Sequence, residues 1–115
     1  MPRRKKPDPL AKRIGARIRE LREEKGLTME QLAYQTERGE RRYGSKGFLS
    51  DVERGLARPT VETLAALAER LEVKLLDLVT FPDEDERALL VDRSRGLTKG
   101  ALRKLLRDTS PPTKK

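Results

Sequence analysis

Short runs of apolar residues at helical spacing constrain this chain more than any other feature. In residues 10–25 the apolar positions recur at steps of four, four and three, which predicts one helix face: Leu10, Ile14, Ile18 and Leu21. Gly26 follows and can end this helix as a left-handed cap. A helix with one apolar stripe must pack against others, so the pattern predicts an all-α fold.

A second and a third predicted helix flank a loop at residues 37–44. Thr28 and Gln31 have the spacing of a capping box, and Leu32 and Ala33 follow them as inward positions. After the loop, Ser45 can cap a helix that ends at Gly55. Its inward positions are Phe48, Leu49 and Val52, and its outward positions are small or polar: Lys46, Gly47, Ser50, Asp51 and Arg54.

Two more helices complete the predicted bundle. Pro59 stops any earlier helix, and Thr60 can cap a new one. The stripe of that helix is Val61, Leu64, Leu67, Ala68 and Leu71. A last turn is expected to close the core with Leu75, Leu76 and Val79. The sequence therefore predicts a five-helix bundle over residues 10–79.

The two ends of the chain differ from this bundle. Residues 1–9 carry four consecutive cations between prolines and are predicted to be a flexible basic arm. Residues 80–115 are predicted to be a helical appendage with a frayed tail, in which acidic residues 83–86 begin one helix and Thr98 caps another. Its leucines either join two copies in a homodimer, which we favour, or fold back on the bundle: Leu89, Leu90, Leu102, Leu105 and Leu106.

Composition narrows the function. The 115 residues include 27 Lys and Arg against 19 Asp and Glu, a net charge of +8, which favours a polyanionic partner such as double-stranded DNA. The chain has no Cys and no His, so we expect no metal site, no cofactor and no enzyme; a small hydrolase built on Asp or Glu pairs has no supporting motif. No apolar run could span a membrane and no signal-peptide core follows the basic start, so we expect a cytoplasmic protein without a membrane partner.

The stretch LTMEQLAYQT, followed by SKGFLSDVERGLARPTVETLAALAERLEV, resembles the helix-turn-helix domain of the phage repressor and Cro family, the XRE-type regulators. The resemblance covers about residues 10–79. Its most specific part is Leu49-x-x-Val52-Glu53-x-Gly55, followed by Pro59-Thr60-x-Glu62-Thr63-Leu64. It implies a transcriptional regulator, such as a repressor, that reads the major groove with the helix at residues 45–54.

The resemblance also implies roles for single residues. Four positions fall at the base-reading face: Lys46, Gly47, Ser50 and Asp51. Lys46 could donate to guanine O6 or N7, Asp51 could accept from cytosine N4, and Gly47 would allow close approach. Glu53 matches an inward acidic position that braces the scaffold. Nine further basic or hydroxyl positions are expected to contact the DNA backbone: Arg3, Arg4, Lys5, Lys6, Arg41, Arg42, Ser45, Arg54 and Arg58.

Three positions depart from the family pattern. About six extra residues lie between the second and third helices, in TERGERRYG. Met29 stands where a polar residue usually holds a phosphate. Glu72 replaces a glycine, so we expect a less sharply capped helix end there.

The alternative function is an antitoxin-like or bridging adaptor, whose main partner is another protein such as a toxin or an antagonist.

Overall fold

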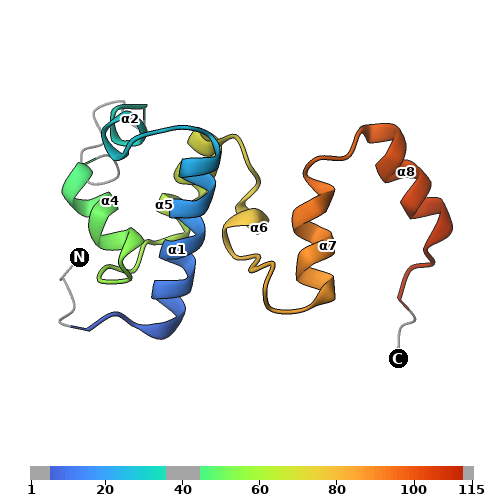
Figure 1. Cartoon of the computed structure of the whole chain (residues 1–115), viewed down its shortest axis with the longest axis horizontal. Helices are drawn as coiled ribbons and strands as arrows, with labels where there is room; N and C mark the ends of the chain where they lie inside the picture. Colours follow the sequence, from blue (N-terminus) through green and yellow to red (C-terminus); the bar gives the residue numbers. More distant parts are fainter. Residues whose placement is uncertain (1–5, 36–44, 113–115) are drawn as a thin grey trace. The chain divides into compact units, whose positions relative to one another are not determined.

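The regular structure of this chain is helical throughout the residues that the computed structural model describes, 6–35 and 45–112. The helices are α1 (Pro9–Glu24), α2 (Met29–Gln35), α4 (Lys46–Glu53), α5 (Val61–Leu71), α6 (Leu75–Leu78), α7 (Glu86–Ser94) and α8 (Lys99–Asp108) (Figure 1). The all-α prediction is confirmed, and α1, α2, α4, α5 and α6 correspond to the five helices predicted for the bundle. The chain divides into two compact units, Met1–Phe81 and Pro82–Lys115.

Each helix of the first unit except α6 begins at a side chain that caps it locally. The Thr28 hydroxyl accepts from the Gln31 N–H at 3.0 Å while Gln31 Oε1 accepts from the Thr28 N–H at 2.8 Å, which is the predicted capping box. Ser45 accepts from the N–H of Phe48 and Thr60 from that of Thr63, at 3.0 and 3.1 Å. These caps lie where the sequence predicts them, because each is made between residues three apart.

The start of α1 differs slightly from its prediction. Asp8 is the N-cap and accepts from the N–H of Ala11 at 3.0 Å, and Pro9 occupies the first helical turn. Proline suits that position because its missing N–H would have no partner there. The helix therefore begins one residue before Leu10, within the segment that the sequence assigned to the arm.

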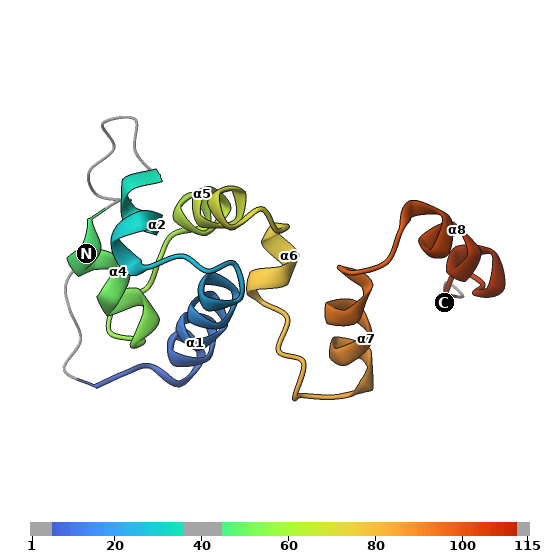
Figure 2. The ribbon, with the colours of Figure 1, turned by 45° about the horizontal axis from the view of Figure 1, so that its top comes forward.

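The core of the first unit lies between α1, α2, α4, α5 and α6. α4 packs on α1 and on α2, and α5 packs on α2 and on α6 (Figure 2). The buried cluster takes residues from all five helices and from the turn after α4: Ile18, Leu21, Leu32, Leu49, Val52, Ala57, Leu67, Ala68, Leu71 and Leu78. This core holds α4 in place on one side and leaves its other side to solvent.

The sequence pattern was wrong about the inward side of α6 and about the burial of one residue in the first turn of α1 and one in the first turn of α5. Leu75, Leu76 and Val79 are exposed, whereas Leu78 is fully buried. α6 is a single turn of four residues, so spacing along the chain says little about which side chain its packing on α5 directs inward. Leu10 and Val61 are also exposed, because each lies in the first turn of its helix, at the end of the stripe.

The end of α5 is capped as sharply as a glycine would cap it, which corrects the expectation for Glu72. This residue has φ 59° and ψ 40°, in the left-handed region, and the N–H of the following Val73 donates to the Ala68 carbonyl at 2.9 Å. The Glu72 carboxylate pairs with Lys25, at the end of α1. A non-glycine residue is strained in this conformation, and Glu72 adopts it nevertheless.

The second unit contains α7 and α8. Asp85 caps α7 by accepting from Ala88 N–H at 2.8 Å, and Thr98 caps α8 by accepting from Ala101 N–H at 3.1 Å, the cap that the sequence predicts. No residue of Glu86–Ser94 or Lys99–Asp108 is buried. None of the helices found in residues 6–35 and 45–112 is long and apolar enough to cross a membrane.

Candidate nucleic-acid interface

α4 has one side in the core and one polar side. Leu49 and Val52 are each only 1% exposed, and Phe48 is half-buried. On the other side Lys46 and Gly47 are exposed, and Ser50 and Asp51 are half-buried. All four predicted base-reading residues therefore lie away from the buried cluster. A Cβ added at Gly47 would meet nothing within 4 Å, so the backbone there is open to an approaching molecule.

Two glycines let α1 and the C-terminal end of α4 approach closely. A Cβ at Gly15, inside α1, would lie 2.1 Å from the Val52 carbonyl oxygen and 2.7 Å from that of Glu53. Gly55, just after α4, has φ 76°, and a Cβ there would lie 2.6 Å from Lys12 Cα. The backbone of α4 thus rests on the backbone of α1, which sets the position of the helix. A glycine within an amphipathic helix is a signal of such contact, and Gly15 has this signal in the sequence.

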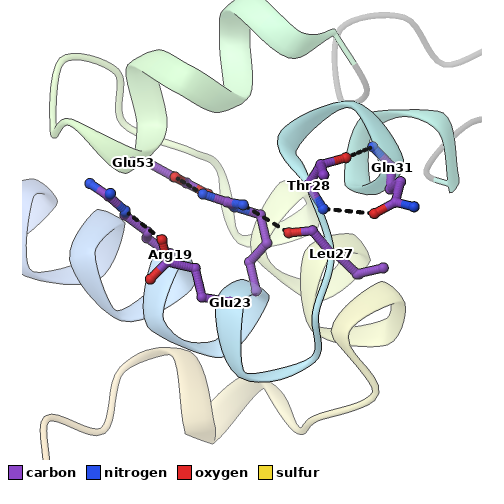
Figure 3. A network of polar contacts seen from close by, with 7 residues as sticks. Arg19, Glu23, Leu27, Thr28, Gln31 and Glu53 are labelled. Carbon is purple, nitrogen blue, oxygen red and sulfur yellow. Dashed lines mark hydrogen bonds and ion pairs between the residues drawn. The ribbon is translucent and has the colours of Figure 1, made fainter.

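A buried ion pair between α1 and α4 fixes the C-terminal end of α4. Arg22 Nε donates to Glu53 Oε2 at 2.7 Å and Arg22 Nη2 to Glu53 Oε1 at 3.1 Å, while Nη1 donates to the Leu27 carbonyl at 2.8 Å (Figure 3). The side chains are 11% and 5% exposed. The hydrogen bond to Glu53 raises the pKa of Arg22 above its usual value. Glu53 braces the scaffold, as the family resemblance implied, and its partner Arg22 was not among the predicted residues.

Three exposed cations around α4 are paired with carboxylates. Lys46 Nζ donates to Glu30 Oε2 of α2 at 3.0 Å, and this hydrogen bond lowers the pKa of the Glu30 carboxyl. The other two pairs are Arg54 with Asp51 at 3.1 Å and Arg58 with Asp8 at 3.0 Å. Glu30 and Asp8 were not among the predicted site residues, since nothing in a single sequence tells which carboxylate a surface cation will meet. Ser45 is exposed, and its hydroxyl oxygen serves as the α4 cap.

Most of the other predicted contacts to the DNA backbone lie outside the described residues. Lys6 is exposed, whereas five cations lie outside the described residues, as does the longer turn between the second and third helices: Arg3, Arg4, Lys5, Arg41 and Arg42. In residues 6–35 and 45–81, Lys and Arg exceed Asp and Glu by only one. The charge surplus of the chain is therefore carried mainly by its other segments.

Met29, the residue at the usual phosphate-binding position of α2, has a packing role. Its side chain is half-buried and lies against the buried cluster. A thioether offers no hydrogen-bond donor to a phosphate. The N-terminal turn of α2 therefore contributes apolar contact and the Glu30 carboxylate to this region.

Comparison with protein families connects this arrangement to known domains. A family described as a helix-turn-helix domain matches residues 13–90. An uncharacterised HTH-type transcriptional regulator of Sinorhizobium fredii, y4dJ, is 43% identical over 76 residues, which are 65% of this chain and 90% of that protein. The HTH-type transcriptional regulator DdrOP3 of Deinococcus deserti is 38% identical over 63 residues, 55% of this chain and 44% of that protein.

Solved structures that resemble this chain also belong to a gene regulator. The clp gene regulator ClgR of Corynebacterium glutamicum superimposes with a TM-score of 0.56 at 29% identity, covering 66% of this chain and 90% of that chain. A second ClgR structure covers 90% of this chain and 96% of that chain, with a TM-score of 0.55 and 25% identity. The similarity in the second comparison extends over residues beyond the bundle, since it covers most of the chain.

Proposed function

We propose that this chain, which belongs to the helix-turn-helix family and is an XRE-like DNA-binding transcriptional regulator, reads the major groove of double-stranded DNA with α4. The observation that carries the proposal is the two-sided character of α4. Leu49 and Val52 lie in the core, and short or polar side chains cover the other side. A helix that enters the groove needs this division, because it must be held by its own domain while it presents donors and acceptors to base edges.

The base contacts are assigned to the exposed side of α4. Lys46 donates to guanine O6 or N7, and Asp51 accepts from cytosine N4. Ser50 can donate or accept, and Gly47 brings the helix backbone close to the groove floor. In the free protein Lys46 and Asp51 each hold an oppositely charged partner, so these contacts replace or extend existing ones.

Phosphate contacts are assigned to the periphery of this face. Arg54 and Arg58 are exposed at the end of α4 and after it, and Ser45 lies at its beginning. The basic arm at residues 3–6 and the arginines at 41 and 42 supply the charge that the nearly neutral bundle lacks. We assign to the protein a cytoplasmic location and a regulatory role without catalysis. The lack of His and Cys supports the absence of catalysis.

Replacement of either Lys46 or Asp51 by Ala is expected to cost about 1–3 kcal/mol of binding free energy at one base pair and to leave the fold intact. The preferred duplex is first selected from a random library with the parent protein. Affinities of the variants are then measured for that duplex and for each of its point mutants. Parent-like base preferences in both variants would contradict direct readout by α4.

We further propose that the protein is a homodimer joined through α7 and α8. Leu90, Leu105 and Leu106 are exposed in a unit whose two helices contain no buried residue. Exposed leucines at helical spacing are typical of a surface that packs against a partner. A dimer would also place two copies of α4 at half-sites about one helical turn of DNA apart. The second candidate function, an adaptor that holds a toxin or another protein antagonist, is favoured by the same exposed leucines.

A chain that ends after Phe81 is expected to sediment as a monomer, while the full chain sediments as a dimer at the same concentration. Phe81 is retained because Arg13 stacks over its ring, 4.2 Å from the centroid. The truncated chain should also lose affinity for a two-half-site duplex and keep its affinity for a single half-site. Monomers in both cases, with unchanged affinity for the long duplex, would favour the adaptor.

A further inference from the structure

Glu30 pairs with Lys46, one of the two charged residues to which we assign base contacts. It lies in the first turn of α2, and its Oε2 accepts from Lys46 Nζ of α4 at 3.0 Å. α2 packs on α4, which brings the two residues together across 16 positions of sequence. Their side chains remain 69% and 60% exposed, so a third molecule can reach the pair.

We propose that Glu30 is a positioning residue for DNA recognition, which directs the Lys46 ammonium toward a base edge and away from phosphates. The inference rests on the proposed role of Lys46 in base readout and deepens it. An ammonium carries three N–H donors, and the bond to Glu30 occupies one of them. The other two can meet the O6 and N7 acceptors of guanine, which lie side by side in the major groove.

A lysine needs such a partner more than an arginine would. Its charge sits on a flexible four-carbon stem without a fixed donor geometry, so an unrestrained ammonium can contact any nearby phosphate. Phosphate contacts add affinity for every sequence and no discrimination. A carboxylate that restrains Lys46 therefore favours the contact that depends on sequence.

The charge of Glu30 acts in the same direction. Glutamate is ionised at neutral pH without any partner, and the hydrogen bond from Lys46 lowers the pKa of the Glu30 carboxyl further. A carboxylate next to the groove-reading helix repels phosphates, and it raises the free energy of complexes in which Lys46 has no guanine to bind. Exposed ion pairs contribute little to folding, so the role expected of this pair is in recognition.

The test is Glu30→Gln in the full chain, measured on three duplexes over a series of salt concentrations. The duplexes are the selected site, the same site with the Lys46 base pair changed, and an unrelated sequence. We expect affinity for the unrelated duplex to rise, with a salt slope steeper by up to about 0.9 for one additional phosphate contact. Discrimination at the Lys46 base pair should fall about threefold to tenfold, and discrimination elsewhere should not change.

Glu72→Gln is the matched control. Glu72 is also an exposed glutamate paired with a lysine, Lys25, and its carboxyl pKa is lowered in the same way. The pair joins the ends of α1 and α5, so the variant changes net charge equally without touching α4. It should leave discrimination at the Lys46 base pair unchanged. Thermal unfolding of both variants checks that each is folded.

The outcomes separate this inference from the proposed function. If Lys46→Ala loses discrimination while Glu30→Gln keeps it, or if both glutamine variants change it equally, Glu30 has no positioning role and base readout by Lys46 stands. If Lys46→Ala itself changes nothing, the base contact is wrong and the role of Glu30 falls with it. Glu30→Gln in the Lys46→Ala background should have no further effect on discrimination, because Glu30 acts through Lys46.

Discussion

Replacement of Arg22 by Met is expected to lower the free energy of unfolding by about 3–5 kcal/mol, because it leaves the Glu53 carboxylate buried without its cation. Glu53 is 5% exposed and receives two hydrogen bonds from Arg22. The Leu27 carbonyl loses its donor as well. Urea unfolding monitored by circular dichroism measures the effect, and a loss of this size is a large part of the stability of a small domain.

Arg19→Met is the control for this prediction. Arg19 is on the same helix and also pairs with a glutamate, Glu23, at 3.1 Å, but both side chains are more than half exposed (Figure 3). An exposed pair four residues apart contributes only about 0.3–0.5 kcal/mol. If both variants lost the same free energy of unfolding, burial of the Arg22–Glu53 pair would not increase the cost of removing its cation. The double variant Arg22→Met with Glu53→Leu should recover much of the lost stability, since no unpaired charge then remains buried.

Gly15→Ala is expected to destabilise the fold by about 3 kcal/mol and to weaken DNA binding in addition. The new methyl group would lie 2.1 Å from the carbonyl oxygen of Val52 and 2.7 Å from that of Glu53. These are backbone atoms, so no side-chain rotation relieves the clash, and α1 and α4 must move apart. A displaced α4 no longer presents its outer side at the angle that the groove requires.

Gly47→Ala separates the effect on folding stability from the effect on DNA binding. A Cβ at Gly47 meets nothing within 4 Å, and Ala is a better helix former than Gly, so stability should stay the same or rise by up to about 1 kcal/mol. Affinity for the selected duplex should nevertheless fall, because the methyl group would come between the helix and the base edges. A Gly15→Ala protein as stable as the parent would contradict the close packing of α1 on α4. Unchanged affinity of Gly47→Ala would contradict close approach of DNA at this position.

The sequence by itself determined the caps of most helices and the two-sided character of α4, the helix to which we assign base reading. The Thr28–Gln31 box and the caps at Ser45, Thr60 and Thr98 involve residues only three apart, so their geometry depends on local backbone conformation. The same holds for the division of α4 into an apolar and a polar side, which follows from helical periodicity. These features could be predicted because few long-range interactions compete with them.

The tertiary structure decided which residues meet across helices. Arg22 and Glu53 are 31 positions apart, Lys46 and Glu30 are 16 apart, and Arg58 and Asp8 are 50 apart. The sequence offers several possible carboxylate partners for each of these cations. The packing of the helices decides which carboxylate forms the ion pair. The short α6 shows the same limit, since its packing on α5 buries Leu78 instead of the three apolar neighbours that periodicity favoured. Long-range pairing depends on distances and angles between helices, which arise from the packing of the whole core and are not written in any short segment of the chain.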